Sequence, residues 1–404
     1  MRNKSKKLRS YCKRRYAKSR IFHWWFWCVR SYFRSFLCEN KPVKRKFKNK
    51  EAPCDVLVLH PSYNSFRLKR KQKLIDKLRA SGVNVVETVA LDENDIIKQK
   101  ASCGPFLYGR LFRCYEGYAN WLKEKFNPKI IITDRNGSIY SPFLKSRTPD
   151  DSVTFHLSHA VLTAQSSRFS MLEYDYYCLY GRSSLEYLRS LPYVFGSCKI
   201  VLGGSVLFDE RFILPAAETT FPLLFLGMGP ELELSSEGRK IYELVRDWQR
   251  LSGRKLYIRL HQRSKGEFWR SLSQEGIEVL PDESFQESAA RVSLVLAPYT
   301  NAVVDAALLR RPVQLIAFPE EKDFLQVEKY FGCRVFDFEG LDKAINRHLH
   351  DYKKSIAACV DFSEFHLEQG VNSVNYINDV LLDLLKMKAA SEAISIDQFA
   401  EVGS

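Results

Sequence analysis

Two short segments of the C-terminal half, RLHQRS and APYTNA, carry polar side chains directly after apolar runs. The polar residues are His261, Arg263 and Ser264 in the first segment, and Thr300 and Asn301 in the second. Polar groups at a strand end and at a helix N-terminus are how open parallel sheets hold phosphate. The two segments therefore predict a nucleotide ligand.

A second set of polar residues follows short apolar strands in the first half of the chain. It consists of Asp134, His159 and the Gly203-Gly204 pair. One polar strand end is ordinary, but several in succession predict the rim of an active site. A neutral histidine is well matched to proton removal near pH 7. His159 is therefore the first candidate for a catalytic base, followed by Asp134 and Glu231.

Most of these residues also have a structural alternative. Asp134 precedes an Asn-Gly pair, where aspartate commonly caps a turn, and the glycine pair fits a tight turn between domains. For His261 the alternative is a strand-end histidine bonded to the backbone. His156 and His159 lie three residues apart across a strand end, a spacing that is metal-like only on a helix or beside acids. No metal site is predicted, and His156 is expected in the core.

The elements around these residues alternate between strand and helix in both halves of the chain. In the first half, a strand at 56–59, a helix at 67–80 and a strand at 85–89 predict a βαβ start. In the second half, strands at 223–226 and 256–260 enclose a helical segment. The pattern predicts an α/β fold of two Rossmann-like domains that face each other. No glycine-rich dinucleotide fingerprint follows the first strand, so NAD and FAD are not expected.

Length and charge agree with two domains preceded by a basic arm. A chain of 404 residues exceeds what a single hydrophobic core usually supports. Residues 1–50 carry 18 Lys/Arg and one acid, whereas the rest carries 44 basic and 46 acidic residues, a net charge of −2. The ten cysteines include no CxxC pair, which predicts free thiols in a reducing, cytoplasmic compartment.

The arm has two parts with different expected behaviour. Residues 1–20 are a like-charge run that is expected to stay unfolded until it meets a polyanion. Residues 21–38 place seven Phe/Trp beside two arginines, and their apolar stretch is too short for a transmembrane helix, which needs about 20 apolar residues. They predict an amphipathic helix on anionic inner-leaflet lipid. The expected lipid contacts are Trp24, Trp25, Phe26, Arg30 and Arg34.

Other interpretations of the arm are an aromatic helix packed on the main body and a nucleic-acid-binding tail. Nucleic acid is not the expected partner, because no nucleic-acid-binding fold follows the arm. A cleavable signal peptide is not expected either, since the arm lacks a long apolar stretch and a small-residue cleavage site.

Four segments, taken in order, resemble the two-domain GT-B glycosyltransferases of bacterial surface-polysaccharide synthesis. That group includes CMP-sugar (sialyl and Kdo) transferases and CDP-glycerol glycerophosphotransferases. The segments are FHLSHA at 155–160, KIVLGGSVLFDE at 199–210, RLHQRS at 259–264 and YTNAVVDAALLRRPVQLI at 299–316. The likeness spans about residues 54–390.

The resemblance implies transfer of a sugar from a nucleotide-sugar donor to a lipid-linked, lipopolysaccharide or capsular glycan acceptor. This reaction would take place at the cytoplasmic face of the plasma membrane. His261 and the helix that begins after Thr300 would stabilise the phosphate leaving group. The other expected donor ligands are Arg263, Ser264, Asn301, Gly203 and Gly204. No metal or other cofactor is expected, because the cleft segments lack a DxD-like acidic pair.

Three positions depart from the family pattern. Gln262 stands where proline is usual, Ala160 where glycine often follows histidine, and Thr300-Asn301 where paired Ser/Thr are common. These departures leave the donor subgroup open. The alternatives are a CDP-polyol phosphotransferase of the teichoic-acid type, which attacks phosphorus rather than carbon, and a non-catalytic nucleotide- or glycan-binding protein.

The expected organisation has four parts. They are a membrane-interfacial arm at 1–50, an acceptor domain at 51–205, a nucleotide-donor domain at 206–365, and a crossover helix with a tail at 366–404.

Overall fold

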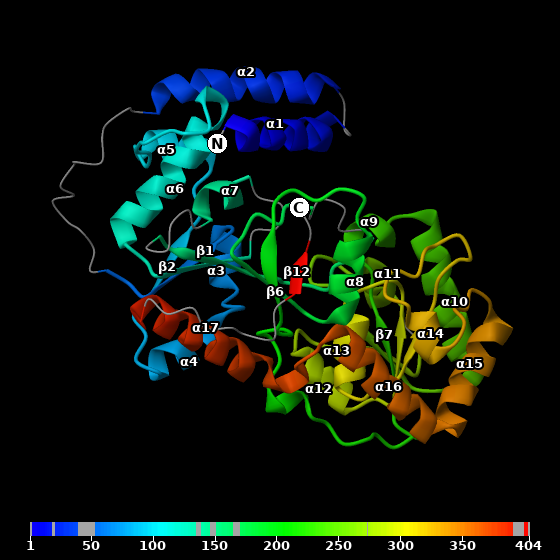
Figure 1. Cartoon of the computed structure of the whole chain (residues 1–404). Helices are drawn as coiled ribbons and strands as arrows, with labels where there is room; N and C mark the ends of the chain where they lie inside the picture. Colours follow the sequence, from blue (N-terminus) through cyan, green and yellow to red (C-terminus); the bar gives the residue numbers. More distant parts are fainter. Residues whose placement is uncertain are drawn as a thin grey trace. The chain divides into compact units, whose positions relative to one another are not determined.

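The computed structural model describes residues 2–17, 21–38, 53–134, 139–145, 151–164, 170–272, 274–390 and 400–402. The chain divides into two compact units (Figure 1). Unit 1 comprises Met1–Tyr180, Ser184–Leu207 and Ser373–Ser404, and unit 2 comprises Gly181–Ser183 and Phe208–Asn372. Both units are Rossmann-like, with parallel strands connected through helices, so the predicted α/β class is confirmed.

Unit 1 is built on a seven-stranded sheet in the order β12-β6-β5-β4-β3-β1-β2. All neighbouring strands are parallel except β12, which pairs antiparallel with β6. The central strands are buried apolar runs, as expected where helices cover both faces of a parallel sheet. The strands are β1 (Val56–His60), β2 (Val85–Val89), β3 (Ile130–Thr133), β4 (Val153–Leu157), β5 (Tyr176–Leu179), β6 (Cys198–Leu202) and β12 (Ala400–Val402).

Helices cover the two faces of this sheet (Figure 1). On one face, α4 (Gln72–Ala80) and α17 (Ser373–Ala390) pack together over the strands. On the other face, α6 (Arg113–Phe126) and α7 (Ser141–Leu144) form the core with Ile131. Unit 1 also contains α3 (Tyr63–Arg67), α5 (Glu93–Lys98), the short η1 (Arg110–Phe112) and most of α8 (Arg182–Ser190).

Unit 2 contains a fully parallel five-stranded sheet in the order β11-β10-β7-β8-β9. Its strands are β7 (Leu223–Leu226), β8 (Leu256–Arg259), β9 (Ile277–Val279), β10 (Leu294–Ala297) and β11 (Val313–Leu315). Its helices are α9 (Pro230–Glu233), α10 (Ser236–Ser252), α11 (Glu267–Arg270), α12 (Phe285–Ala290), α13 (Ala302–Leu308), α14 (Val327–Phe331), α15 (Phe338–His350) and α16 (Tyr352–His366), with a short η3 (Glu210–Phe212) and η4 (Gly370–Asn372).

Local sequence explains where the longest helix of unit 2 begins and ends. At the start of α10, the Ser235 hydroxyl accepts a hydrogen bond from the Gly238 amide at 3.0 Å. The helix ends at Gly253, whose φ of 66° is the left-handed conformation that glycine adopts easily. Between these caps, Ile241, Val245 and the fully buried Trp248 pack against the sheet.

The helix expected at 67–80 is shorter than predicted. It begins at Gln72 as α4, and a separate short helix, α3, lies at Tyr63–Arg67, with Lys69 in a left-handed φ of 48° between them. Alternation of strand and helix would continue with a strand at 334–336, but only an isolated bridge between Ile316 and Val335 forms there. The charged sequence around His348 predicts a solvent-facing side chain, but His348 is buried and its Nδ1 lies 3.0 Å from the Ser355 hydroxyl.

The first part of the N-terminal arm is folded, so the prediction of an unfolded charge run is wrong. Residues Arg2–Ala17 form α1, and its Leu8, Tyr11 and Cys12 are buried in the core of unit 1. These three residues recur at helical spacing, which gives the charged helix an apolar face.

The second part of the arm forms α2 (Ile21–Leu37), the expected helix. Two of its five expected lipid contacts turn toward unit 1 instead: Trp24 is buried, and Arg34 forms an ion pair with Glu93. Within the ranges the structure describes, no helix has the length and apolar character needed to cross a membrane.

Candidate active site

The carboxyl edge of the unit 2 sheet has a topological switch point. The first strand of the unit, β7, lies between β8 and β10: the chain runs from β7 outward through β8 to β9, and then crosses to β10 and β11 on the other side of β7. Open α/β sheets bind ligands outside the carboxyl ends of their strands at such a point. Here the three adjacent strand ends deliver the loop 227–229, His261 and Thr300 to one edge. The two segments singled out by sequence therefore lie on the same edge of one sheet.

His261 has its ring orientation fixed by the backbone. Its Nδ1 accepts a hydrogen bond from the amide of Arg263 at 3.2 Å, so the proton of the neutral ring is on Nε2. Partial burial, helped by the positive charge of Arg263, lowers the pKa of His261 from its ordinary value. A neutral ring with an Nε2–H donor is suited to bind phosphate oxygen.

Gly229 keeps open the space beside this histidine. A methyl group at Gly229 would lie 3.8 Å from Cε1 of His261 and 3.5 Å from Nη2 of Arg263. A larger side chain at this position would reach further into the space beside both residues. Sequence reasoning placed Gly229 in a loop after β7 without assigning it to the site; its signal was a Gly-x-Gly turn at the end of a buried strand.

Arg263 and Glu231 form an exposed bidentate ion pair, with N–O distances of 2.9 and 3.3 Å. Bonding to its own backbone amide and to Arg263 lowers the pKa of Glu231. This makes Glu231, the third candidate base, a weak acceptor of protons. Exposed ion pairs contribute little to stability, so an anionic ligand can displace Glu231 from Arg263.

Ser264 is held within its own loop. Its hydroxyl donates to a carboxylate oxygen of Glu233 and accepts from the amide of Gly266 at 2.9 Å. The other oxygen of Glu233 is buried without a partner among the residues that the structure describes. Ser264 therefore orders the loop that carries His261 and Arg263.

The turn after β10 presents Thr300 and Asn301. The Thr300 hydroxyl accepts from the Ala302 amide at 3.3 Å, and Asn301 is exposed at the start of α13. One turn later, burial raises the pKa of Asp305 to about 7. Asp305 was missed by sequence reasoning, although a single charge in the apolar run AVVDAALL was a usable signal.

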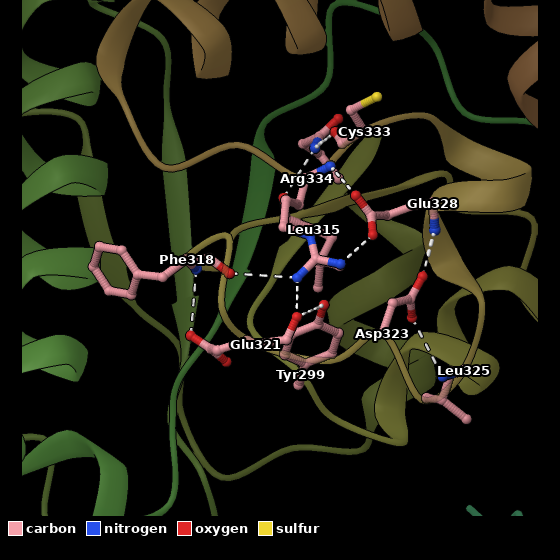
Figure 2. Close-up of polar contacts among 10 residues, drawn as sticks. Tyr299, Leu315, Phe318, Glu321, Asp323, Leu325, Glu328, Cys333 and Arg334 are labelled. Atoms are coloured by element: carbon pink, nitrogen blue, oxygen red, sulfur yellow. Dashed lines mark hydrogen bonds and ion pairs between the residues drawn. The ribbon is translucent and has the colours of Figure 1, made fainter.

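Arg334 lies beside Tyr299, the residue that precedes Thr300 (Figure 2). Its guanidinium lies 5.7 Å from the ring centroid of Tyr299, forms an ion pair with Glu328, and donates to the carbonyl oxygens of Phe318, at 3.3 Å, and Glu321. The pairing with Glu328 raises the pKa of Arg334. This network fixes the residue that precedes Thr300.

In unit 1, Asp134 and Lys71 form a nearly buried ion pair beyond the end of β3. Lys71 Nζ lies 2.8 Å from Oδ2 of Asp134, and Lys71 is 4% exposed. The second oxygen, Oδ1, is buried and has no partner in the described part of the chain. Lys71 was missed because sequence reasoning placed it inside a longer helix.

His159 follows β4, the strand next to β3. His159 is an exposed residue, but the protein around its ring partly desolvates the ring and so lowers its pKa. Asp134 opposes this effect, while Arg70 and Lys71 add to it. His159 and Asp134 therefore interact electrostatically, and the imidazole is neutral near pH 7.

Two further histidines lie near this edge. His60, at the end of β1, is buried with Nε2 3.1 Å from Glu87 Oε2, and sequence reasoning had placed it in a loop. His156 is buried in β4 and stacks on Tyr177 at 4.0 Å, so its expected place in the core is confirmed. No group of three or more His, Cys, Asp and Glu in the described ranges could hold a metal ion.

The Gly203-Gly204 pair has a structural role in unit 1. Both amides donate to the Leu179 carbonyl, at 3.0 and 3.2 Å, and Gly204 has a φ of 75°. A methyl group at Gly203 would lie 2.5 Å from Cys178 Sγ and 2.9 Å from Ile377 Cγ1. With their amides engaged, we do not include the two glycines in the phosphate site. Residues 135–138, expected as part of the turn after Asp134, lie outside the described residues.

Comparison with known proteins defines the fold. No protein-family model matches the chain, and no curated protein is similar to it in sequence. A provisionally assigned UDP-N-acetylglucosamine 2-epimerase from Listeria monocytogenes matches with a TM-score of 0.55 and 12% identity, covering 85% of this chain and 98% of that chain. UDP-GlcNAc 2-epimerase from Neisseria meningitidis, solved with bound UDP-GlcNAc, matches with a TM-score of 0.51 and 10% identity, covering 81% and 99%. The chain therefore has a GT-B-like fold of two Rossmann-like units.

Proposed function

We propose that this chain is a glycosyltransferase that takes a sugar from a nucleotide-sugar donor. The observation that carries the proposal is His261, a neutral histidine that follows β8, the strand beside the switch point of the unit 2 sheet, and whose Nε2–H can donate a hydrogen bond. A GT-B-like fold supports a sugar nucleotide as the ligand, and a similar structure holds UDP-GlcNAc.

The donor phosphates bind at the carboxyl edge of unit 2. As the bond from the anomeric carbon to the phosphate oxygen breaks, negative charge grows on the phosphate. His261 donates a hydrogen bond to that oxygen, and Arg263 leaves Glu231 to pair with it. Thr300 adds its hydroxyl. Because the backbone already fixes the ring of His261, this hydrogen-bond donor lowers the barrier without reorganising.

The acceptor hydroxyl is activated at the carboxyl edge of unit 1. Neutral His159 takes the hydroxyl proton as the oxygen forms its bond to the anomeric carbon. Asp134 stabilises the imidazolium electrostatically, while Lys71 holds the carboxylate in place. The products are the glycosylated acceptor, the nucleotide and one proton.

A lipid-linked, lipopolysaccharide or capsular glycan at the cytoplasmic face of the membrane is the proposed acceptor. The support is the resemblance of the four ordered segments to surface-polysaccharide transferases. The alternative is a CDP-polyol phosphotransferase, in which the acceptor oxygen attacks phosphorus. The same side chains, His261, Arg263 and Thr300, would then stabilise the phosphate charge.

The test begins with thermal shift of the full chain against CMP-, CDP-, UDP- and GDP-linked donors, including UDP-GlcNAc and CDP-glycerol, because ligands that bind the folded state raise Tm. Turnover is then measured with the donor that binds. His261→Ala is expected to lower kcat by roughly 10²–10³-fold, the usual loss for one such donor.

The matched control is His350→Ala, an exposed histidine on α15, which is expected to leave kcat unchanged. Near-normal turnover in His261→Ala would refute the phosphate assignment. A donor that binds without any turnover would instead favour the non-catalytic nucleotide-binding protein.

A further inference from the structure

The outward face of α2 is apolar and unpartnered among the described residues. Seven of its side chains are between 50% and 75% exposed. They recur at the spacing of one helical stripe: Phe22, Trp25, Phe26, Val29, Phe33, Phe36 and Leu37. The side toward unit 1 carries Trp24, Ser31 and Ser35, which are buried. An ordinary surface helix has the opposite arrangement, with its apolar stripe inward.

Specific contacts hold α2 in this orientation. Arg34 pairs with Glu93 of α5, and Arg110 donates to the Tyr32 hydroxyl at 3.1 Å. Trp27 stacks on Trp24 and lies 6.1 Å from Phe112. The helix that carries the apolar stripe is therefore held in place by contacts with other elements of unit 1.

Beneath α2, its neighbour α1 is anchored to the body of unit 1 (Figure 1). Lys4 of α1 forms an ion pair with buried Glu173 at 2.5 Å, and the Ser5 hydroxyl donates to the Tyr108 carbonyl at 2.8 Å. The two helices and the segment Tyr108–Phe112 line one surface.

A groove of about 470 Å³ runs between these three elements. Trp25, Val29 and Phe33 from the apolar stripe line one side of it. Arg9 of α1 and Arg110 add two cations to the lining, and both arginines are exposed. An apolar channel with cations at its edge matches a hydrocarbon chain that ends in an anionic headgroup.

The charge of α1 extends this match beyond the groove. The segment 2–17 contains eight Lys/Arg and no acid, and Lys6, Lys7 and Lys13 are exposed. Such a cluster beside an apolar stripe is attracted to anionic lipid. A second copy of the chain would instead bring like charges together, which opposes association through this surface.

We infer that the surface formed by α2, α1 and Tyr108–Phe112 docks on an anionic lipid bilayer. The aromatic stripe of α2 lies in the interface plane, one acyl chain enters the groove, and Arg9 and Arg110 lie at the level of the lipid phosphate. This inference goes beyond the proposed reaction, since docking needs neither donor nor acceptor.

The experiment is co-sedimentation of the full chain with vesicles of phosphatidylcholine, with and without phosphatidylglycerol. Binding is expected only to the anionic vesicles and is expected to weaken as salt rises, because salt screens exposed charges. Trp25→Ser with Phe33→Ser is expected to reduce partition at least roughly 10-fold, since both side chains lose their apolar contact with lipid. Arg9→Glu is expected to reduce partition to anionic vesicles as well.

The control is Leu234→Ser, which removes the most exposed large apolar side chain of unit 2, at 84%, and is expected to leave partition unchanged. Circular dichroism and the nucleotide thermal shift verify that each variant is folded. Unchanged partition of the aromatic double variant, or no binding by the parent chain, overturns the inference. Concentration-dependent dimerisation without vesicles that the double variant abolishes would also overturn it, in favour of a second copy.

Discussion

His261 and His159 are both neutral near pH 7, and each has the state that its proposed role requires. The backbone amide of Arg263 donates a hydrogen bond to Nδ1 of His261, so the ring proton is on Nε2, which can donate in turn. His159 needs the opposite property, a ring able to accept a proton. Packing around its ring, with Arg70 and Lys71 nearby, lowers its pKa, while Asp134 limits the shift.

The pH dependence of turnover tests the proposed base. Because the pKa of His159 is lowered, activity should fall only as pH drops below the ordinary histidine range. Arg70→Gln removes one positive charge that disfavours the imidazolium. The pKa of His159 then rises, and the acidic limb of kcat/KM moves to higher pH.

Arg67→Gln, an exposed arginine on α3, is the matched control and should leave that limb in place. An acidic limb that does not move in Arg70→Gln would argue against His159. If kcat/KM falls by the same factor at every pH and the acidic limb does not shift, Arg70 acts on acceptor binding instead of on His159.

At the scale of elements, the turn after β6 packs between β5 of the unit 1 sheet and the final helix, α17. Gly203 lies against Cys178 of β5 and Ile377 of α17, and the turn's amides are bonded to Leu179. If this turn binds phosphate, as the sequence predicts, a substitution in it should weaken nucleotide binding. If it packs the core, the substitution should lower stability.

Gly203→Ala should destabilise unit 1 by about 1–3 kcal/mol, the usual cost of overpacking, because the new methyl group meets Cys178 Sγ and Ile377. Chemical denaturation measures the loss. Adding Cys178→Ala removes one of the two clashing atoms, so the double variant should lose less than the two single losses combined. Full stability together with lost nucleotide affinity would restore the phosphate role.

At the scale of the whole molecule, the two units carry different parts of the proposed chemistry. Unit 2 holds the groups assigned to the donor, and unit 1 holds the candidate base, the basic helix α1 and the aromatic stripe of α2. The eight Lys/Arg of α1 thus lie at the proposed lipid surface and not at the phosphate site.

Hydrogen exchange with the nucleotide that gives the largest thermal shift tests this division. Protection is expected at 227–229, 261–264 and 299–302, and His261→Ala should weaken it. Protection centred on residues 203–204 would contradict the assignment of the donor site to unit 2.

The sequence by itself determined the elements and the residues at their ends. Strands such as Leu223–Leu226 and helices such as Ser236–Ser252 are encoded by local periodicity and caps, and strand ends identify His261, Thr300, Asp134 and His159 without any long-range information. Lys69, whose backbone breaks a helix, shows the limit of periodicity.

Tertiary structure alone decided how these residues are paired and which faces are covered. Lys71 meets Asp134 across 63 residues, and Arg334 supports Tyr299 from a different element. The aromatic pattern of α2 predicted an amphipathic helix, but only packing showed that Trp24 and Arg34 turn inward while Trp25 and Phe33 face out. The physical reason is that local propensity fixes an element's period, whereas burial of one face depends on contacts with distant residues.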